Sequence, residues 1–162
     1  MKTLLASLLF IYAFATNAGI YNGNQNLEEG WALFGGDPMA ISKAPLFPDG
    51  IIFTTIMENE GHPSVVLNTY KECPTPKEHD FYKAQIGDTW INMIALCTNS
   101  NRVRIVARTQ RGADFIVQRL IKSKDPVVLK FYGSYSQVDI SIPATNFKQA
   151  IEYFKEKELN AL

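Results

Sequence analysis

The chain has 162 residues, of which 46% are hydrophobic and 20% charged, and its 16 Lys and Arg residues balance 16 Asp and Glu residues. This composition is typical of an ordinary globular protein. Zero net charge excludes a simple polycation, so we expect no nucleic-acid partner.

Residues 1–18 are typical of a secretory signal peptide. Lys2 gives a positive start, residues 4–15 form an almost unbroken apolar run, and Thr16 and Ala18 are small residues at the positions that a signal peptidase reads. The alternative is a membrane anchor, but a run of about twelve apolar residues is short for a span of about twenty. We therefore expect a periplasmic or secreted protein with one domain over residues 19–162, and no transmembrane segment after cleavage.

Short strands account for most of the mature chain. Residues 19–30 read as a loose lead-in, residues 35–50 as turn-rich, residues 71–80 as irregular because of two prolines, and residues 81–86 as ambiguous. Strands are expected from β-branched and aromatic content and from alternation at residues 31–34, 51–57, 65–70, 89–97, 102–109, 127–133 and 138–142.

The two cysteines, Cys73 and Cys97, are predicted to form a disulfide. In an exported chain an even pair of cysteines favours a bridge, which would stabilise the fold by roughly 3 kcal/mol on the chain-entropy model. The alternative is a reactive thiol with His62 or His79 as its base, and nothing in the spacing favours it.

Two helices are expected, and they complete the fold prediction. Residues 113–122 have apolar side chains at helical spacing. In the closing helix Phe147, Ala150, Ile151 and Phe154 form an apolar stripe, after Thr145 or Asn146 as a cap. Since the strand connections are short, pairing should be antiparallel. The prediction is a mainly β (α+β) fold, an antiparallel sandwich or bent sheet of six or seven strands with the C-terminal helix packed on it.

The charges are unevenly divided along the chain. Residues 19–100 hold four Lys against ten acidic residues, whereas residues 101–162 hold eleven basic residues against six acidic ones. On a strand, Arg102, Arg104 and Arg108 would share one face about 7 Å apart, with Arg111 just beyond. These four arginines are the candidate site for an anionic partner. The alternative is an ordinary solvated face that pairs with acids of the first half.

The sequence contains no motif of a known catalytic or metal site. It lacks HExxH, CxxC, an EF-hand loop, GxSxG and a phosphate-binding loop. We therefore expect no metal, no cofactor and no catalytic residues. The aromatic side chains, including Trp31, Phe53, Tyr70, Trp90 and Phe131, are expected in the core.

The part of the chain from Cys97 onward resembles the end of the invasion-associated locus B family of small exported bacterial proteins. The residues concerned are Cys97, the run ADFIVQRLIKSKDPVVLKF and the run QVDISIPATNFKQAI. The resemblance implies an exported β-sandwich without established catalysis, linked in some cases to host contact or envelope upkeep, and it transfers no active site. The sequence thus favours a non-enzymatic binding, accessory or inhibitor-like protein whose partner is a protein or an anionic envelope component. The alternative is a small exported hydrolase or other envelope enzyme.

Overall fold

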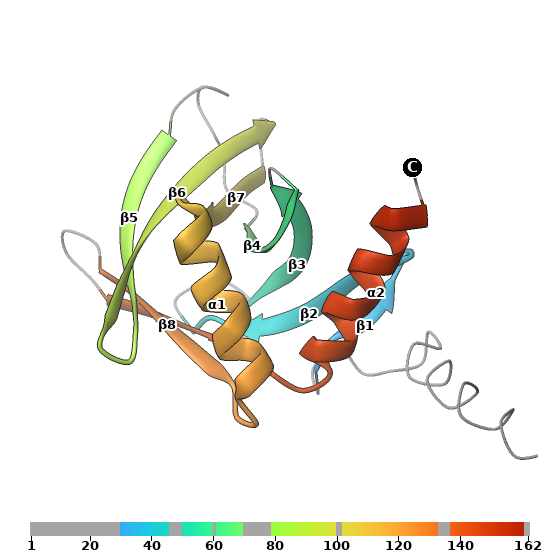
Figure 1. Ribbon diagram of the computed structural model, residues 1–162. Coiled ribbons are helices and arrows are strands. Elements are labelled where there is room, and N and C mark those ends of the chain that lie inside the picture. Colours follow the sequence, from blue (N-terminus) through green and yellow to red (C-terminus); the bar gives the residue numbers. More distant parts are fainter. Residues whose placement is uncertain are drawn as a thin grey trace, which may run out of the picture.

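The computed structural model describes residues 30–45, 50–59, 61–69, 79–99, 102–132 and 137–160, and these residues form a mainly β fold (Figure 1). The predicted signal peptide and Cys73 lie outside the described residues. All strand pairs are antiparallel, as predicted. The strands within the described ranges are β1 (Ala32–Phe34), β2 (Asp37–Lys43), β3 (Ile51–Asn59), β4 (His62–Thr69), β5 (His79–Ile86), β6 (Thr89–Asn99), β7 (Arg102–Ala107), β8 (Val127–Tyr132) and β9 (Gln137–Ile142).

Eight of these strands close into a barrel. Their order is β2-β3-β4-β7-β6-β5-β8-β9, and a pairing of Lys43 with Ser141 joins β9 back to β2, while β1 is an extra strand beside β2. The predicted sandwich or open bent sheet of six or seven strands is therefore wrong. Closure depends on pairing between strands far apart in the sequence, which no local pattern specifies.

On β3, β8 and β9 one face of the strand contributes to the barrel interior. On β8, Val127, Leu129 and Phe131 are buried while the residues between them are exposed, as expected for a strand with one face in the core. Corresponding inward positions include Ile56 on β3 and Ile140 on β9. The outward positions of the same strands are therefore the ones available to a partner.

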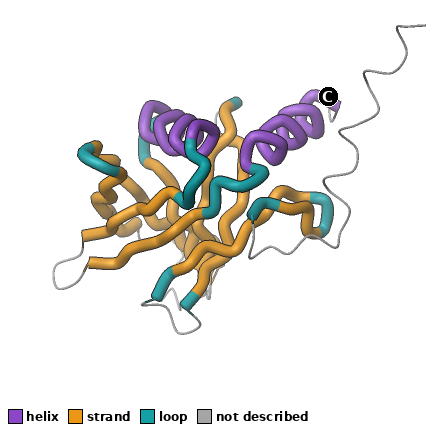
Figure 2. The backbone as a smooth tube through the Cα atoms, turned by 90° about the horizontal axis from the view of Figure 1, so that it is seen from below, coloured by secondary structure: helices purple, strands orange, loops and turns teal. Residues whose placement is uncertain are grey.

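Two helices, α1 (Gln110–Lys122) and α2 (Phe147–Asn160), pack side by side against the strands (Figure 2). The predicted stripe on α2 is confirmed, because Phe147, Ala150, Ile151 and Phe154 are all buried. Helix α1 begins three residues earlier than predicted. Its N-cap is Thr109, whose hydroxyl accepts a hydrogen bond from the Gly112 N–H at 3.2 Å.

Two segments that were not predicted as strands, one expected to be turn-rich and one left ambiguous, are strands. The segment predicted as turn-rich contains β2, which carries Pro38 near its start and pairs with β3 through Met39 to Lys43. The ambiguous residues 81–86 belong to β5, which pairs with both β6 and β8. Tertiary pairing thus decides the structure of segments whose local composition is indifferent.

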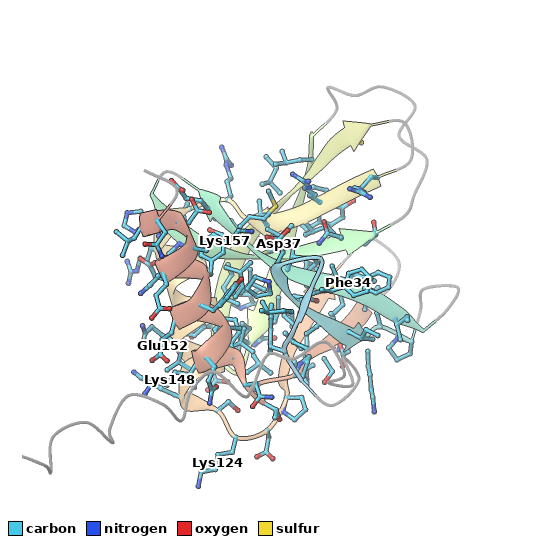
Figure 3. The ribbon with its side chains drawn as sticks, turned by 90° about the vertical axis from the view of Figure 1, so that its right-hand side faces the viewer. Phe34, Asp37, Lys124, Lys148, Glu152 and Lys157 are labelled. Atoms are coloured by element: carbon cyan, nitrogen blue, oxygen red, sulfur yellow. The ribbon has the colours of Figure 1, made fainter. Side chains whose placement is uncertain are left out.

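The start of the described chain is fixed against its end. Gly30 is buried, and a Cβ there would lie 2.7 Å from the carbonyl oxygen of Thr145, so the backbones meet closely. The N–H of Trp31 donates to the same oxygen at 3.0 Å. Further along, the ammonium of Lys157 on α2 lies 2.6 Å from the Asp37 carboxylate (Figure 3). That hydrogen bond raises the pKa of Lys157, so the ammonium stays charged at neutral pH, and the stability that it contributes is lost as the pH rises through this raised pKa.

Candidate functional site

The four candidate arginines do not form one strip. Arg102 and Arg104 lie on β7, but β7 ends at Ala107, so Arg108 lies one residue beyond the strand and Arg111 is in the first turn of α1. The predicted strand over residues 102–109 is therefore too long. Arg108 and Arg111 are exposed, whereas Arg102 and Arg104 are only partly exposed.

Arg104 has an environment unlike that of a surface cation. It lies directly opposite Asn68 on β4 and Leu96 on β6, and its Nε is buried without a hydrogen-bond partner. A half-buried guanidinium of this kind is poorly placed to meet a large anionic partner. The two exposed arginines, Arg108 and Arg111, line hollows in a different part of the barrel.

Arg108 lines an open hollow on the outside of the barrel, which we call the Trp90 hollow. Its volume is about 450 Å³. Its described lining residues are Tyr82, Lys83, Trp90, Asn92, Met93, Arg108 and Tyr132. Most of these residues lie on β5, β6 and β8, and Figure 1 shows these strands on the side of the barrel away from α2.

The strand register brings the polar residues of the Trp90 hollow together. Tyr132 on β8 is directly opposite Lys83 on β5, which is directly opposite Asn92 on β6. The row continues to Arg108, whose N–H donates to the Asn92 carbonyl oxygen at 2.9 Å. The Cα atoms of directly opposed residues lie about 4.5–5.5 Å apart, so the Cα atoms of Lys83 and Arg108 are about 10 Å apart. The two cationic residues therefore flank the hollow.

An exposed aromatic pair forms one wall of the hollow. The ring centroids of Trp90 and Tyr132 are 4.9 Å apart with an interplanar angle of 48°. Trp90 is 55% exposed and Tyr132 is 38% exposed. The Tyr132 hydroxyl donates to Gln85 Oε1 at 2.8 Å, which fixes the ring on the β5 surface. Rings of this size dominate contact energies when a partner covers them, so their joint exposure marks a contact surface.

The charged side chains among the described lining residues of the Trp90 hollow are all positive. Lys83 and Arg108 line it, and its described lining residues include no carboxylate. By contrast, a hollow of about 440 Å³ between the β3–β4 turn and α2 is lined by Glu58 and Glu158 as well as Lys155. The Trp90 hollow therefore combines aromatic surface, positive charge and the Asn92 amide, a combination that suits a ligand with both flat apolar faces and negative charge.

Of the seven described lining residues, only Arg108 was predicted as a site residue, and the six that were missed include Trp90, Tyr132 and Lys83. The signal was present in the predicted strand 89–97, where Ile91 and Met93 alternate with Trp90 and Asn92. This alternation places Trp90 on the same face as a polar residue, and therefore outside the core. The expectation that Trp90 lies in the core is wrong, whereas Trp31 and Phe131 are buried as predicted.

The remaining predictions of the sequence concern cysteines, metals and membranes. Cys97 is partly buried on β6, and because Cys73 lies outside the described residues, their pairing stays a prediction. Within the described ranges there is no group of three or more His, Cys, Asp or Glu side chains that could hold a metal ion. In the same ranges, neither helix is long and apolar enough to cross a membrane.

Comparison of the chain with protein-family models, with curated proteins and with solved structures gives no match. The geometry and charge of the Trp90 hollow are therefore the features of this chain that bear on its function.

Proposed function

We propose that this chain is an exported binding protein without catalytic activity, and that it holds an anionic glycan of the cell envelope or cell surface in the Trp90 hollow. The observation that supports this most directly is the exposed Trp90–Tyr132 pair, with Lys83 and Arg108 beside it and no described carboxylate lining the hollow. Export follows from the signal-peptide pattern of residues 1–18, and intact mass of the exported protein should show a chain that begins at Gly19.

The chemistry of the lining residues favours a charged sugar. The flat apolar surface of Trp90 matches the apolar face of a sugar ring. Lys83 and Arg108 can pair with carboxylates, and the Asn92 amide can both donate to and accept from hydroxyl groups. A nucleic acid shares the stacking and the charge, but it is a poor match for the predicted export, so we place it among the outcomes of the test.

The test is titration of the mature protein with trigalacturonate, a short carboxylated glycan, and with uncharged maltotriose as the control ligand. Trigalacturonate should bind and maltotriose should not. Binding should weaken with added salt, because exposed charges are screened. Absence of trigalacturonate binding would contradict the proposal, and cleavage products in the mixture would favour the alternative of a small exported hydrolase.

The decisive variant is Trp90→Ala. Loss of aromatic stacking costs about 1–3 kcal/mol, so affinity should fall by roughly 5- to 150-fold. The matched control is Phe34→Ala, because Phe34 is 63% exposed on β1 and does not line the hollow. Equal affinity of the two variants would mean that the ligand does not use the Trp90 hollow.

A further inference from the structure

Two further hollows lie near the Trp90 hollow. The helix hollow, of about 260 Å³, lies between the start of β6 and the first turn of α1, and Arg111 and Phe115 line it. The hairpin hollow, of about 430 Å³, lies among the β5–β6 turn, the end of α1 and the start of β8. Its described lining includes Arg119, Lys122 and Lys130.

The three hollows lie around the β5–β6 hairpin. Trp90 and Asn92 line both the Trp90 hollow and the helix hollow. Tyr132 of the Trp90 hollow and Lys130 of the hairpin hollow are both exposed on one face of β8, about 7 Å apart. Lys130 is also directly opposite Gln85, which is directly opposite Trp90.

The helix hollow has this position because β6 extends beyond β7. The β6–β7 pairing ends at Met93 and Ala107, so Thr89 to Asn92 have a strand partner on β5 only. The chain then turns into α1 beside this free edge. Trp90 consequently borders a hollow on each side.

Positive side chains line all three hollows, although the carboxylates of Asp88 and Asp114 are also exposed on neighbouring positions of the β5–β6 turn and of α1. Along α1, Arg111, Arg119 and Lys122 are exposed over a length of about 16 Å. The Arg119 guanidinium lies 5.2 Å from the centroid of the Phe115 ring, so an aromatic surface interleaves with the charges here as well. Six cations line the three hollows, and the described lining contains no carboxylate; they are Lys83, Arg108, Arg111, Arg119, Lys122 and Lys130.

We infer that the three hollows form one extended binding track for a linear polyanionic glycan, with several sugar residues bound at once. This inference rests on the proposed function, since it assigns to the same site a chain instead of a single sugar. A chain would stack on Trp90 and Tyr132 and continue toward the cations of the hairpin hollow. A linear polyanion gains from every further cation that it reaches, as in other groove-like sites for charged polymers.

The experiment compares digalacturonate with decagalacturonate on the full mature protein. The decamer should bind at least tenfold more tightly per molecule than the dimer. The variant Arg119→Gln/Lys122→Gln/Lys130→Gln should abolish this advantage while it leaves dimer affinity within twofold. The variant Lys43→Gln/Lys148→Gln/Lys155→Gln, which removes the same charge from exposed lysines outside the three hollows, should keep the advantage.

The outcomes separate the inference from the function on which it rests. Equal affinity for dimer and decamer would overturn the extended track and leave the Trp90 hollow as a short site. Equal losses in the two triple variants would overturn it too, because net charge alone would then explain the length dependence. Binding of neither glycan would overturn the proposed function itself. Tighter binding of a ten-residue oligothymidylate than of the decamer would replace the glycan by a nucleic acid.

Discussion

Two buried serines of this barrel differ in the hydrogen bonding of their hydroxyl groups. Ser42 on β2 and Thr54 on β3 are both fully buried, and their hydroxyl groups are hydrogen-bonded to each other. Ser64 on β4 is 3% exposed, and its hydroxyl oxygen has no hydrogen-bond partner. A satisfied and an unsatisfied polar group of the same kind thus lie in one fold.

Substitution of each serine by alanine should separate these two situations. Ser42→Ala leaves the Thr54 hydroxyl without its partner and should cost about 1–3 kcal/mol in the free energy of unfolding. Ser64→Ala removes a hydroxyl that gains nothing in the folded state and should be neutral or slightly stabilising. Denaturant titration of both variants measures the difference, and an equal loss would mean that Ser64 has a hydrogen bond in solution.

The two tryptophans show which residue environments the sequence can predict. The exposure of Trp90 could be predicted from the sequence, because Trp90 alternates with inward residues of a predicted strand. Trp31 is buried by contacts with residues far along the chain. Its Nε1–H donates to the Pro143 carbonyl oxygen at 2.8 Å, and its ring meets Phe147 edge-on with centroids 4.9 Å apart. The burial of Trp31 was expected from its hydrophobicity, but its contacts with Pro143 and Phe147 could not be predicted from the local sequence pattern.

At the scale of elements, α2 is the clearest case of a pattern that predicts packing. Phe154 is 8% exposed and belongs to the hydrophobic core, whereas Lys155 beside it is exposed. Phe154→Ala should cost about 3–5 kcal/mol, through lost apolar contact and the cavity that remains. Lys155→Ala should change the free energy of unfolding by less than about 0.5 kcal/mol.

Thermal and denaturant unfolding of the two variants would check this expectation. Both substitutions place alanine at neighbouring helix positions, so helix propensity changes little between them. Small and equal effects would show that α2 is peripheral to the core. In that case its buried stripe would not be what holds the end of the chain against the barrel.

The elements that were missed have a common physical cause. Segment β2 has Pro38 near its start and lies in a stretch rich in turn-forming residues, yet its later residues pair with β3. Segment β5 alternates apolar and polar residues only over its last five residues, Tyr82 to Ile86, and it is held in the sheet by pairing with β6 along its whole length and with β8 over Lys83 to Gln85. Strand β7 ends, and helix α1 begins, earlier than predicted, because Thr109 caps the helix instead of continuing the strand. In each case a partner or a cap elsewhere decided what composition left open.

At the scale of the whole molecule, the sequence predicted antiparallel β structure but not a closed barrel. Adjacent strands such as β3 and β4 form a hairpin that short connections make predictable. The pairs β4–β7, β5–β8 and β2–β9 join strands far apart in the sequence. The β5–β8 pair brings Tyr132 next to Lys83 and so creates the Trp90 hollow. The candidate arginines were found by charge alone, whereas the hollow could not be found without the strand order.

The barrel is paired unevenly, and the Trp90 hollow lies where β5 is paired on both sides, although Trp90 and Asn92 themselves have a strand partner on β5 only. β6 pairs with β5 over its first eight residues and with β7 over most of the rest, so Met93 to Leu96 have partners on both sides. The seam between β2 and β9 is joined by the pair of Lys43 and Ser141. A site on β5 and β6 is therefore expected to be largely preformed, which lowers the ordering cost of binding.

Amide hydrogen exchange should reveal this gradient. Amides of Met93 to Leu96 should exchange only through global opening, because ladders on both sides protect them. Amides of β9 that point away from β8, toward the seam, should exchange faster by local opening. Residue-resolved exchange by NMR measures both sets in one sample. If the seam amides were as protected as those of β6, the closure would be as strong as the rest of the barrel. If β6 exchanged as fast as the seam, the hollow would not be preformed, and glycan binding would have to order the surface on which it depends.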